Sequence, residues 1–178
     1  MRSFNYSTFY THDDRATKTF EHIMWKYNLS FQFTPEYDGS MGSAGETRAY
    51  GVDPPLLAPY GVAWDGVYLG SAAMASEQFA ANTLIHENSH YEDGFGYVFL
   101  SSLGHDKYFE WVDGGRTEVL SNQDVINIFA WIEGEKEAIL DQQAHPTYGY
   151  LHPGETVDIV TYWNDHVGYK NDMIAHGY

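Results

Sequence analysis

Two histidines and one glutamate stand together in a pattern that is typical of metal-dependent hydrolysis. His86-Glu87-Asn88-Ser89-His90 fits the pattern H-E-x-x-H. Residues four apart lie on the same face of a helix, so His86 and His90 can offer two imidazole nitrogens to one metal ion. Glu87 is turned by about 100° from His86, which lets it reach a water at that metal without being a ligand itself. The spacing therefore predicts a zinc site with its own general base.

The same three side chains could instead form a solvated polar face of a helix. The segment 76–94 that contains them is rich in Ala, Leu, Ile and Phe, however, so this helix is expected to be buried on most sides. Ionisable groups without compensation would be costly in such a place. The metal site is therefore the preferred interpretation.

The segment that carries the motif also has the start and stop signals of a helix. Ser76 is a suitable N-cap, and Glu77 places a negative charge in the first turn. Phe79 and Thr83 form a stripe with the two histidines at helical spacing, and Gly94 is a natural stop. We therefore expect one helix from about residue 76 to residue 94.

Zinc held by two histidines needs a third protein ligand and one position for water. The chain has no cysteine, so the third ligand must be a histidine or a carboxylate, which is the chemistry of catalytic zinc. The metzincin pattern is excluded because Asp93 and Gly96 occupy its Gly and third His positions. A glutamate from a second helix is the commoner remaining arrangement, and the candidates are Glu118 and Glu135.

Glu118 is the preferred third ligand. The apolar stripe of Val125 and Phe129 reaches it when extended backwards, so Glu118 is expected to face the core. Residues 113–122 also resemble the gluzincins, the thermolysin-like branch of the zincin metallopeptidases, in which G-x-x-N-E-x-x-S-D supplies the ligand glutamate. Thr117 stands where that branch has Asn, and Asn122 stands where it has the Asp that supports the first histidine. The resemblance implies zinc bound by His86, His90 and Glu118.

Glu135 is the alternative third ligand. It lies in the stretch E-G-E-K-E-A, in which E-x-E-A resembles a ligand motif of other zincin families. Ile128 and Ile139 are among the apolar neighbours that place it in the middle of a helical stripe. A competing interpretation is that Glu133, Glu135 and Glu137 form a solvated charged face.

Residues 61–69 are similar to the edge strand and turn that hold the substrate backbone in the gluzincins. Asp65-Gly66 separates two short apolar runs, which favours a type I′ hairpin. The resemblance implies that Ala63 and Trp64 hold an extended peptide by strand addition. It covers roughly residues 60–123, and nothing in the chain matches the large C-terminal domain of that family.

The motif and the resemblance together imply a zinc-dependent metalloendopeptidase, a hydrolase that acts on peptides or proteins. Glu87 would take a proton from the attacking water and hand it to the leaving amine. The oxyanion also needs a donor besides zinc, usually a Tyr or His that follows the ligands in the chain. The candidates, which the sequence does not rank, are Tyr148, Tyr150, His152, Tyr162 and His166.

The fold expected around this site is α+β of the zincin type, in one domain that spans residues 1–178. A small mixed sheet with an edge hairpin would pack on the His86 helix, with the Glu118 helix beneath it. The other expected elements are a helix over 13–28, a strand over 29–34, a long surface loop over 35–61, a mostly helical stretch over 113–144 and an amphipathic segment over 157–170. A capping box of Ser121 and Asp124 offers an alternative helix start near residue 122, and the apolar runs 97–100 and 107–112 fit either helix or strand.

The composition limits the partners. The net charge of −16, from 25 acidic and 9 basic residues, speaks against nucleic acids and anionic membranes. No run of 18 apolar residues is present, and the first residues lack the apolar stretch of a signal peptide. The compartment stays open, and a secreted protein or the processed end of one is compatible with the sequence. The alternative functions are a catalytically inactive protein stabilised by zinc and an acidic, aromatic binding module.

Overall fold

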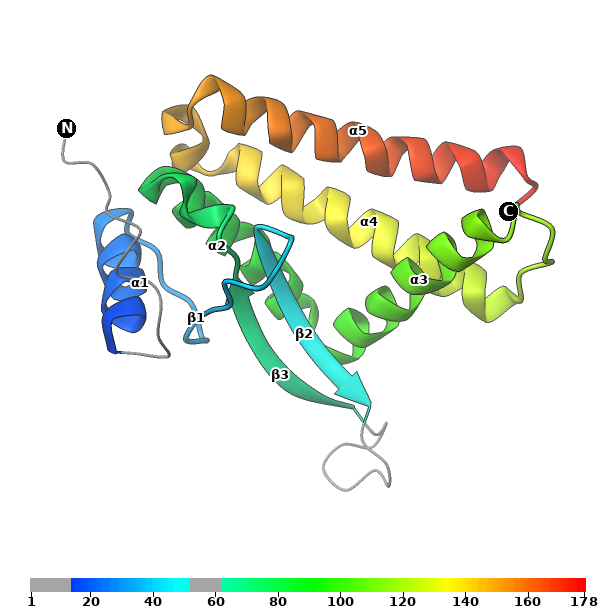
Figure 1. Cartoon of the computed structure of the whole chain (residues 1–178), viewed down its shortest axis with the longest axis horizontal. Coiled ribbons are helices and arrows are strands. Elements are labelled where there is room, and N and C mark those ends of the chain that lie inside the picture. The colour runs from blue at the N-terminus through cyan, green and yellow to red at the C-terminus, as the bar shows by residue number, and fades with distance from the viewer. Residues whose placement is uncertain (1–13, 52–61) are drawn as a thin grey trace.

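We analysed a computed structural model of the chain, which describes residues 14–51 and 62–178. Within these residues the chain forms five α-helices and one mixed three-stranded sheet, so the α+β prediction is confirmed. The elements, shown in Figure 1, are α1 (Asp14–Lys26), β1 (Glu36–Tyr37), β2 (Gly45–Gly51), β3 (Val62–Leu69), the 3-10 helix η2 (Ala73–Ala75), α2 (Glu77–Asp93), α3 (Phe95–Asp113), α4 (Asn122–Ala144), the 3-10 helix η3 (Pro146–Tyr150) and α5 (Pro153–Ala175). No described helix is long and apolar enough to cross a membrane.

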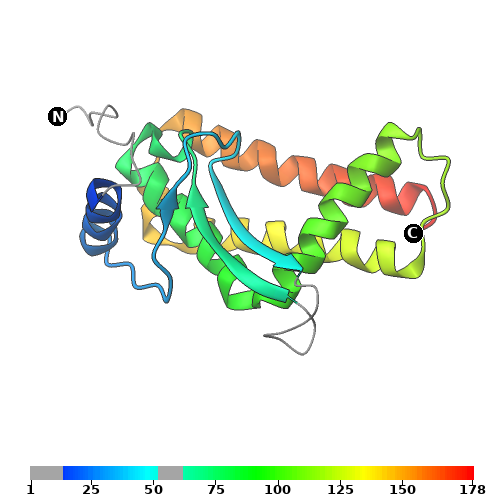
Figure 2. The same cartoon turned by 60° about the horizontal axis from the view of Figure 1, so that its bottom comes forward.

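The central strand of the sheet is β3. β1 pairs with its end in parallel, at Tyr68 and Leu69, and β2 pairs with it in antiparallel fashion from one end to the other. The strand order β1-β3-β2 makes β2 an edge of the described sheet. Figure 2 shows this pair of strands curving across the helical layer, with β2 in contact with α2 and α3. The edge strand β2 therefore lies next to the helix that carries the H-E-x-x-H motif.

The strand predicted over residues 29–34 is wrong, and so is the first part of the long loop predicted over residues 35–61, of which residues 52–61 lie outside the described residues. Residues 29–34 form bends and irregular structure, whereas Gly45–Gly51 of the predicted loop is strand β2. The alternating side chains Phe31 and Phe33 stack on each other, with ring centroids 5.1 Å apart, and pack against the core of α1 and α2. Their period of two therefore reflects packing of a connecting segment on helices and not pairing in a sheet.

The hairpin turn predicted at Asp65-Gly66 is also wrong. β3 runs through both residues, with Gly66 paired to Arg48 of β2. A Cβ on Gly66 would lie only 2.9 Å from the ring of Tyr68, so this glycine makes room for an aromatic ring. The register of the two strands shifts here, because Trp64 pairs with Ala49 and Asp65 has no partner residue in β2. Asp-Gly therefore forms an irregularity within the strand and not a turn.

The prediction for the motif helix is confirmed at both ends. The Ser76 hydroxyl accepts a hydrogen bond from the Phe79 N–H at 2.9 Å, and Gly94 ends α2 with φ +88°. The apolar side of α2 packs on α1, where it contributes to a cluster of Phe20, Ile23, Leu69, Ala73, Met74, Ala80, Ala81 and Leu84. This packing fixes α2 and leaves its other side for α4.

The C-terminal half of the molecule is helical. The two apolar runs after Gly94 belong to one helix, α3, and α4 begins at Asn122 behind the capping box of Ser121 and Asp124. α4 and α5 run antiparallel to each other (Figure 1). A second cluster joins α3, α4 and α5 and consists of Tyr108, Trp111, Leu120, Ile128, Trp131, Ile132 and Met173. The site described below lies between the two clusters.

Candidate metal centre

Two histidines of α2 and one glutamate of α4 converge at the contact between these helices. His86 Nε2 lies 3.2 Å from His90 Nε2 and 3.2 Å from Glu135 Oε2. His90 Nε2 lies 3.5 Å from the other oxygen, Glu135 Oε1. The three side chains are 11–15 % exposed. Within the described part of the chain, this group of ligand atoms is close enough to hold a metal ion.

The distances fit a tetrahedral metal ion. Ligand atoms that each lie about 2.0–2.1 Å from a tetrahedral zinc ion are about 3.3 Å apart from one another. The three separations here are 3.2, 3.2 and 3.5 Å. Nitrogen from two imidazoles and oxygen from one carboxylate also form a donor set that divalent metals prefer. The group could therefore hold a metal ion without rearrangement of its helices.

Glu118, the preferred third ligand in the sequence analysis, lies elsewhere. Its carboxylate accepts hydrogen bonds from Lys107 Nζ at 2.9 and 3.1 Å, and its side chain is 53 % exposed. Because α4 begins only at Asn122, Glu118 belongs to the connection between α3 and α4, and the stripe extended backwards from Val125 does not reach it. The structure brings Glu135, not Glu118, to the two histidines, and the order of preference is corrected accordingly.

Glu135 owes its position to the packing of α4. Its neighbours Ile132 and Ile139 are fully buried, and α4 packs against α2 as well as against α3 and α5. Gly134 lies beside the ring of Tyr97, to which an added Cβ would come within 3.1 Å. α4 is continuous through this point, and the Glu135 side chain is only 15 % exposed. The competing interpretation of Glu135 as a solvated charge is therefore wrong.

Gln142 orients the first histidine and was missed by sequence reasoning. His86 Nδ1 lies 3.1 Å from Gln142 Oε1. An amide oxygen can only accept, so Nδ1 carries the hydrogen and Nε2 keeps its lone pair for a metal. Gln142 Nε2 donates to Asn82 Oδ1 at 3.0 Å, and the Asn82 amide donates to Thr147 Oγ1 at 3.2 Å. The spacing of two helical turns between Glu135 and Gln142 is the signal that could have found it.

Glu87 is buried beside the site and is held by β2. Thr47 Oγ1 donates to Glu87 Oε2 at 2.8 Å. A Cβ on Gly45 would lie 2.4 Å from the other carboxylate oxygen, Oε1, so β2 can approach Glu87 this closely only with glycine there. Burial raises the pKa of the Glu87 carboxyl, although His86 and His90 oppose this. The raised pKa suits a base that must also release its proton.

Glu135 and His90 perturb each other strongly. Burial lowers the pKa of His90, but the Glu135 carboxylate outweighs it and raises the pKa to about 9. Burial raises the pKa of Glu135, but His90 and His86 outweigh it and hold that pKa well below its ordinary value. Without a metal, Glu135 therefore forms an ion pair with the protonated His90.

Among the candidate oxyanion donors, Tyr162 of α5 lies at the site. Its hydroxyl donates to Glu135 Oε2 at 3.0 Å, and its ring centroid is 6.2 Å from that of His86. Partial desolvation of its hydroxyl and the Glu135 charge raise the pKa of Tyr162, so the phenol is neutral, although the residue as a whole is 42 % exposed. His166, one turn later, donates from Nδ1 to the Tyr162 carbonyl at 2.9 Å and supports this turn from the buried side.

Three of the other candidate donors, Tyr148, Tyr150 and His152, do not line the site. Tyr148 and Tyr150 belong to η3, and His152 precedes α5, where its backbone N–H donates to Glu155 Oε2. None of these three residues lines either of the pockets that flank the site. The structure therefore brings Tyr162, and not these three residues, to the site.

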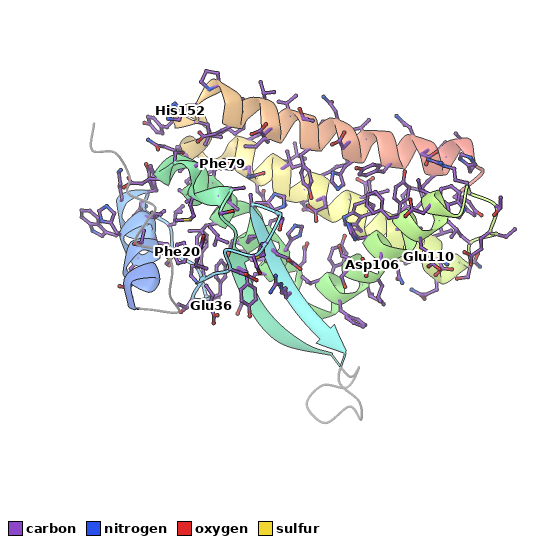
Figure 3. All side chains as sticks on the ribbon, viewed as in Figure 1. Phe20, Glu36, Phe79, Asp106, Glu110 and His152 are labelled. Atoms are coloured by element: carbon purple, nitrogen blue, oxygen red, sulfur yellow. The ribbon has the colours of Figure 1, made fainter. Side chains whose placement is uncertain are left out.

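Two pockets flank the site and share Ser43, Gly45, His86, Glu87 and Tyr162. The first, of about 280 Å³, has an apolar wall that includes Phe79 and Ile159. The second, of about 460 Å³, is polar, with Ser101, Ser102, His105 and Asp106. Figure 3 labels Phe79 and Asp106, which lie well apart on either side of the β2 strand. Together the pockets form a cleft that passes the site.

The strand that borders this cleft is β2. Ser43, Gly45 and Glu46 line one or both pockets. Ala63 and Trp64, which the resemblance assigned to substrate binding, lie in the central strand β3, where they pair with Tyr50 and Ala49 of β2. The described sheet therefore presents β2, and not β3, as the edge next to the site.

Comparison of the chain with family models, with curated proteins and with solved structures gave no match.

Proposed function

We propose that this protein is a zinc-dependent metalloendopeptidase of the zincin type, with His86, His90 and Glu135 as zinc ligands and Glu87 as the general base. One observation carries the proposal: the H-E-x-x-H pair and a buried glutamate of a second helix meet at tetrahedral spacing beside an open cleft. The donor set supports zinc in particular, because two histidines and one carboxylate, with a position left for water, are typical of catalytic zinc.

Zinc in this place would polarise the scissile carbonyl and lower the pKa of a water molecule. Glu87 accepts the proton of the attacking water and passes it to the leaving amine. Thr47 occupies Glu87 Oε2, so Oε1, which faces Gly45 and the cleft, is the oxygen available for this transfer. The direction of the Glu87 pKa supports the first half of the transfer, since a more basic carboxylate accepts the proton more readily.

Tyr162 stabilises the oxyanion that develops on the substrate carbonyl. Its neutral phenol is a hydrogen-bond donor, and its hydroxyl already lies at the ligand carboxylate, 3.0 Å from Glu135 Oε2. A donor that is preorganised where charge develops stabilises the transition state more than the ground state. His166 is a positioning residue, because it holds the backbone of the turn that carries Tyr162.

The test combines metal content with cleavage of a library of N-acetylated peptides, monitored by mass spectrometry. We expect one zinc per chain in the wild type and in Glu87→Gln, because Glu87 is not a ligand. Cleavage should fall roughly 10²- to 10⁴-fold in Glu87→Gln through loss of the general base. A chain that binds no zinc, or a Glu87→Gln variant that cleaves as fast as the wild type, would contradict the proposal.

A further inference from the structure

The cleft contains one carboxylate that the mechanism does not use. Asp158, on α5, lines the pocket of about 280 Å³ together with Phe79, Thr83 and Ile159. Its carboxylate makes no hydrogen bond or ion pair with any residue in the described ranges 14–51 and 62–178. A carboxylate in a pocket without a cationic partner has free capacity to bind a cation from outside.

The other acidic side chains that line the cleft all have partners. Glu46 pairs with Arg48 at 3.0 Å, and Asp106 pairs with His105 at 2.9 Å. Glu87 accepts from Thr47 and Glu135 pairs with the histidines, as described above. Asp158 is therefore the acidic residue at the described cleft that is left to recognise a ligand.

The position of Asp158 defines the shape of a ligand. Asp158 precedes Tyr162 by four residues, so the two lie on the same face of α5 and about 6 Å apart along its axis. Tyr162 marks the reacting centre through its contact with Glu135. Phe79 and Ile159 line the same pocket and give it an apolar wall. The pocket thus suits a side chain with an aliphatic stem and a cationic end, which describes lysine and arginine.

We propose that this pocket binds a lysine or arginine side chain of the substrate, so that the enzyme cleaves peptide bonds next to a basic residue. The inference rests on the proposed function, which places the reacting centre at the mouth of the pocket. The net charge of −16 also favours the approach of cationic peptides at low ionic strength.

The test uses pairs of N-acetylated peptides that differ only by lysine or norleucine beside the cleaved bond. Norleucine keeps the aliphatic stem without the ammonium, and acetylation leaves the side chain as the only variable cation. The variant is Asp158→Asn, and its matched control is Asp165→Asn; both aspartates are exposed on the same helix, but Asp165 lines neither pocket. We expect Asp158→Asn to lower kcat/KM for the lysine peptide roughly 10- to 100-fold, the range of a charged hydrogen bond, without effect on the norleucine peptide. Asp165→Asn should leave both values unchanged.

Two further outcomes separate this inference from the proposed function. If peptides are cleaved without preference for lysine, or if Asp158→Asn keeps that preference, the basic-residue pocket is refuted and the peptidase stands. If no peptide is cleaved, the proposed peptidase function is refuted. Calorimetric binding of the same peptides to zinc-loaded protein then tests whether the pocket recognises a basic side chain. Tighter binding of the lysine peptide that disappears in Asp158→Asn would support the pocket, and equal binding of the two peptides would overturn it.

Discussion

At the scale of single residues, the side chains of the site have three different roles: metal ligand, general base and hydrogen-bonded support. Glu135 lies within 3.5 Å of both histidines, whereas Glu118 is occupied by Lys107 at the surface. Gln142 Oε1 accepts a hydrogen bond from His86 Nδ1, the ring nitrogen that does not face the proposed metal. Thr47 Oγ1 donates a hydrogen bond to Glu87. Each of these contacts predicts a different consequence of a single substitution, so the roles can be separated by measurement.

The two glutamate candidates predict opposite effects on zinc binding. Glu135→Ala removes a ligand, so its zinc affinity should fall by more than the roughly 10- to 100-fold that is typical for the loss of an outer partner. Glu118→Ala, the control, breaks only an exposed ion pair and should keep one zinc per chain. Elemental analysis and competition with a chromogenic chelator measure both. Zinc lost from Glu118→Ala but kept by Glu135→Ala would reverse the assignment made from the geometry.

Gln142 should matter for zinc although it does not touch the metal. In Gln142→Leu the His86 Nδ1–H loses its acceptor, so the ring is free to turn, and we expect zinc affinity to fall roughly 10- to 100-fold. The neighbouring Gln143 is exposed, and Gln143→Leu is the matched control. The same chelator competition compares them. Equal affinities for the two variants would show that the contact of 3.1 Å does not orient His86.

At the scale of elements, three helices and one edge strand build the site. α2 carries the motif, α4 carries Glu135 and Gln142, and α5 brings Tyr162 and Asp158 over the cleft. β2 closes the remaining side, and Gly45 is the point at which it comes nearest to Glu87. Each ligand or base therefore depends on a contact between elements that are far apart in the sequence.

The approach of β2 to α2 predicts that Gly45 cannot carry a side chain. In Gly45→Ala the new Cβ would lie 2.4 Å from Glu87 Oε1, so the carboxylate or the strand has to move. A displacement of about 1 Å near a reacting group can cost 10²-fold in rate, and we expect a loss of this size in kcat/KM. Gly42→Ala is the control, because nothing lies within 4 Å of a Cβ at Gly42. Steady-state kinetics of both variants with normal zinc content test this, and full activity of Gly45→Ala would refute the assigned position of Glu87.

At the scale of the whole molecule, the site couples the two hydrophobic clusters. One cluster ties α1, β3 and α2 together, and the other ties α3, α4 and α5 together. His86 and His90 belong to the first half, and Glu135 belongs to the second. The interaction between them therefore contributes to the stability of the entire fold, both with and without a metal.

The metal-free protein should lose stability as the pH rises from 6.5 to 9. The pKa of His90 is about 6.5 in an unfolded chain and about 9 in the folded protein. A raised pKa contributes stability that is fully present below pH 6.5 and is lost as the pH approaches 9, by at most about 3 to 4 kcal/mol. Glu135 has a lowered pKa, so its contribution persists throughout this range and is lost only in acid. Urea unfolding after treatment with a chelator measures the slope.

The control for the pH effect is His90→Gln, which should lack the loss of stability between pH 6.5 and 9. Zinc should reverse the trend in the wild type, because it binds deprotonated histidine and therefore stabilises the protein more as the pH rises. Identical slopes with and without zinc would show that His90 is not a ligand.

The sequence by itself determined the features that depend on local spacing. The interval of four residues put His86 and His90 on one face of a helix, and Ser76 and Gly94 marked the ends of that helix. Local composition was also sufficient for the α+β class, and the capping box at Ser121 gave the start of α4 as an alternative. These features could be predicted because their physical causes act within one or two helical turns.

Only the tertiary structure decided which elements meet. In the folded chain Glu135, and not Glu118, lies next to the histidines. β2 forms where a loop was expected, and Asp65-Gly66 lies within strand β3. The tertiary structure also brought Gln142 to His86 across 56 positions of the chain and placed Asp158 in the cleft. The reason is that packing between helices and pairing between strands depend on the shapes of distant surfaces, and no local spacing encodes such a contact.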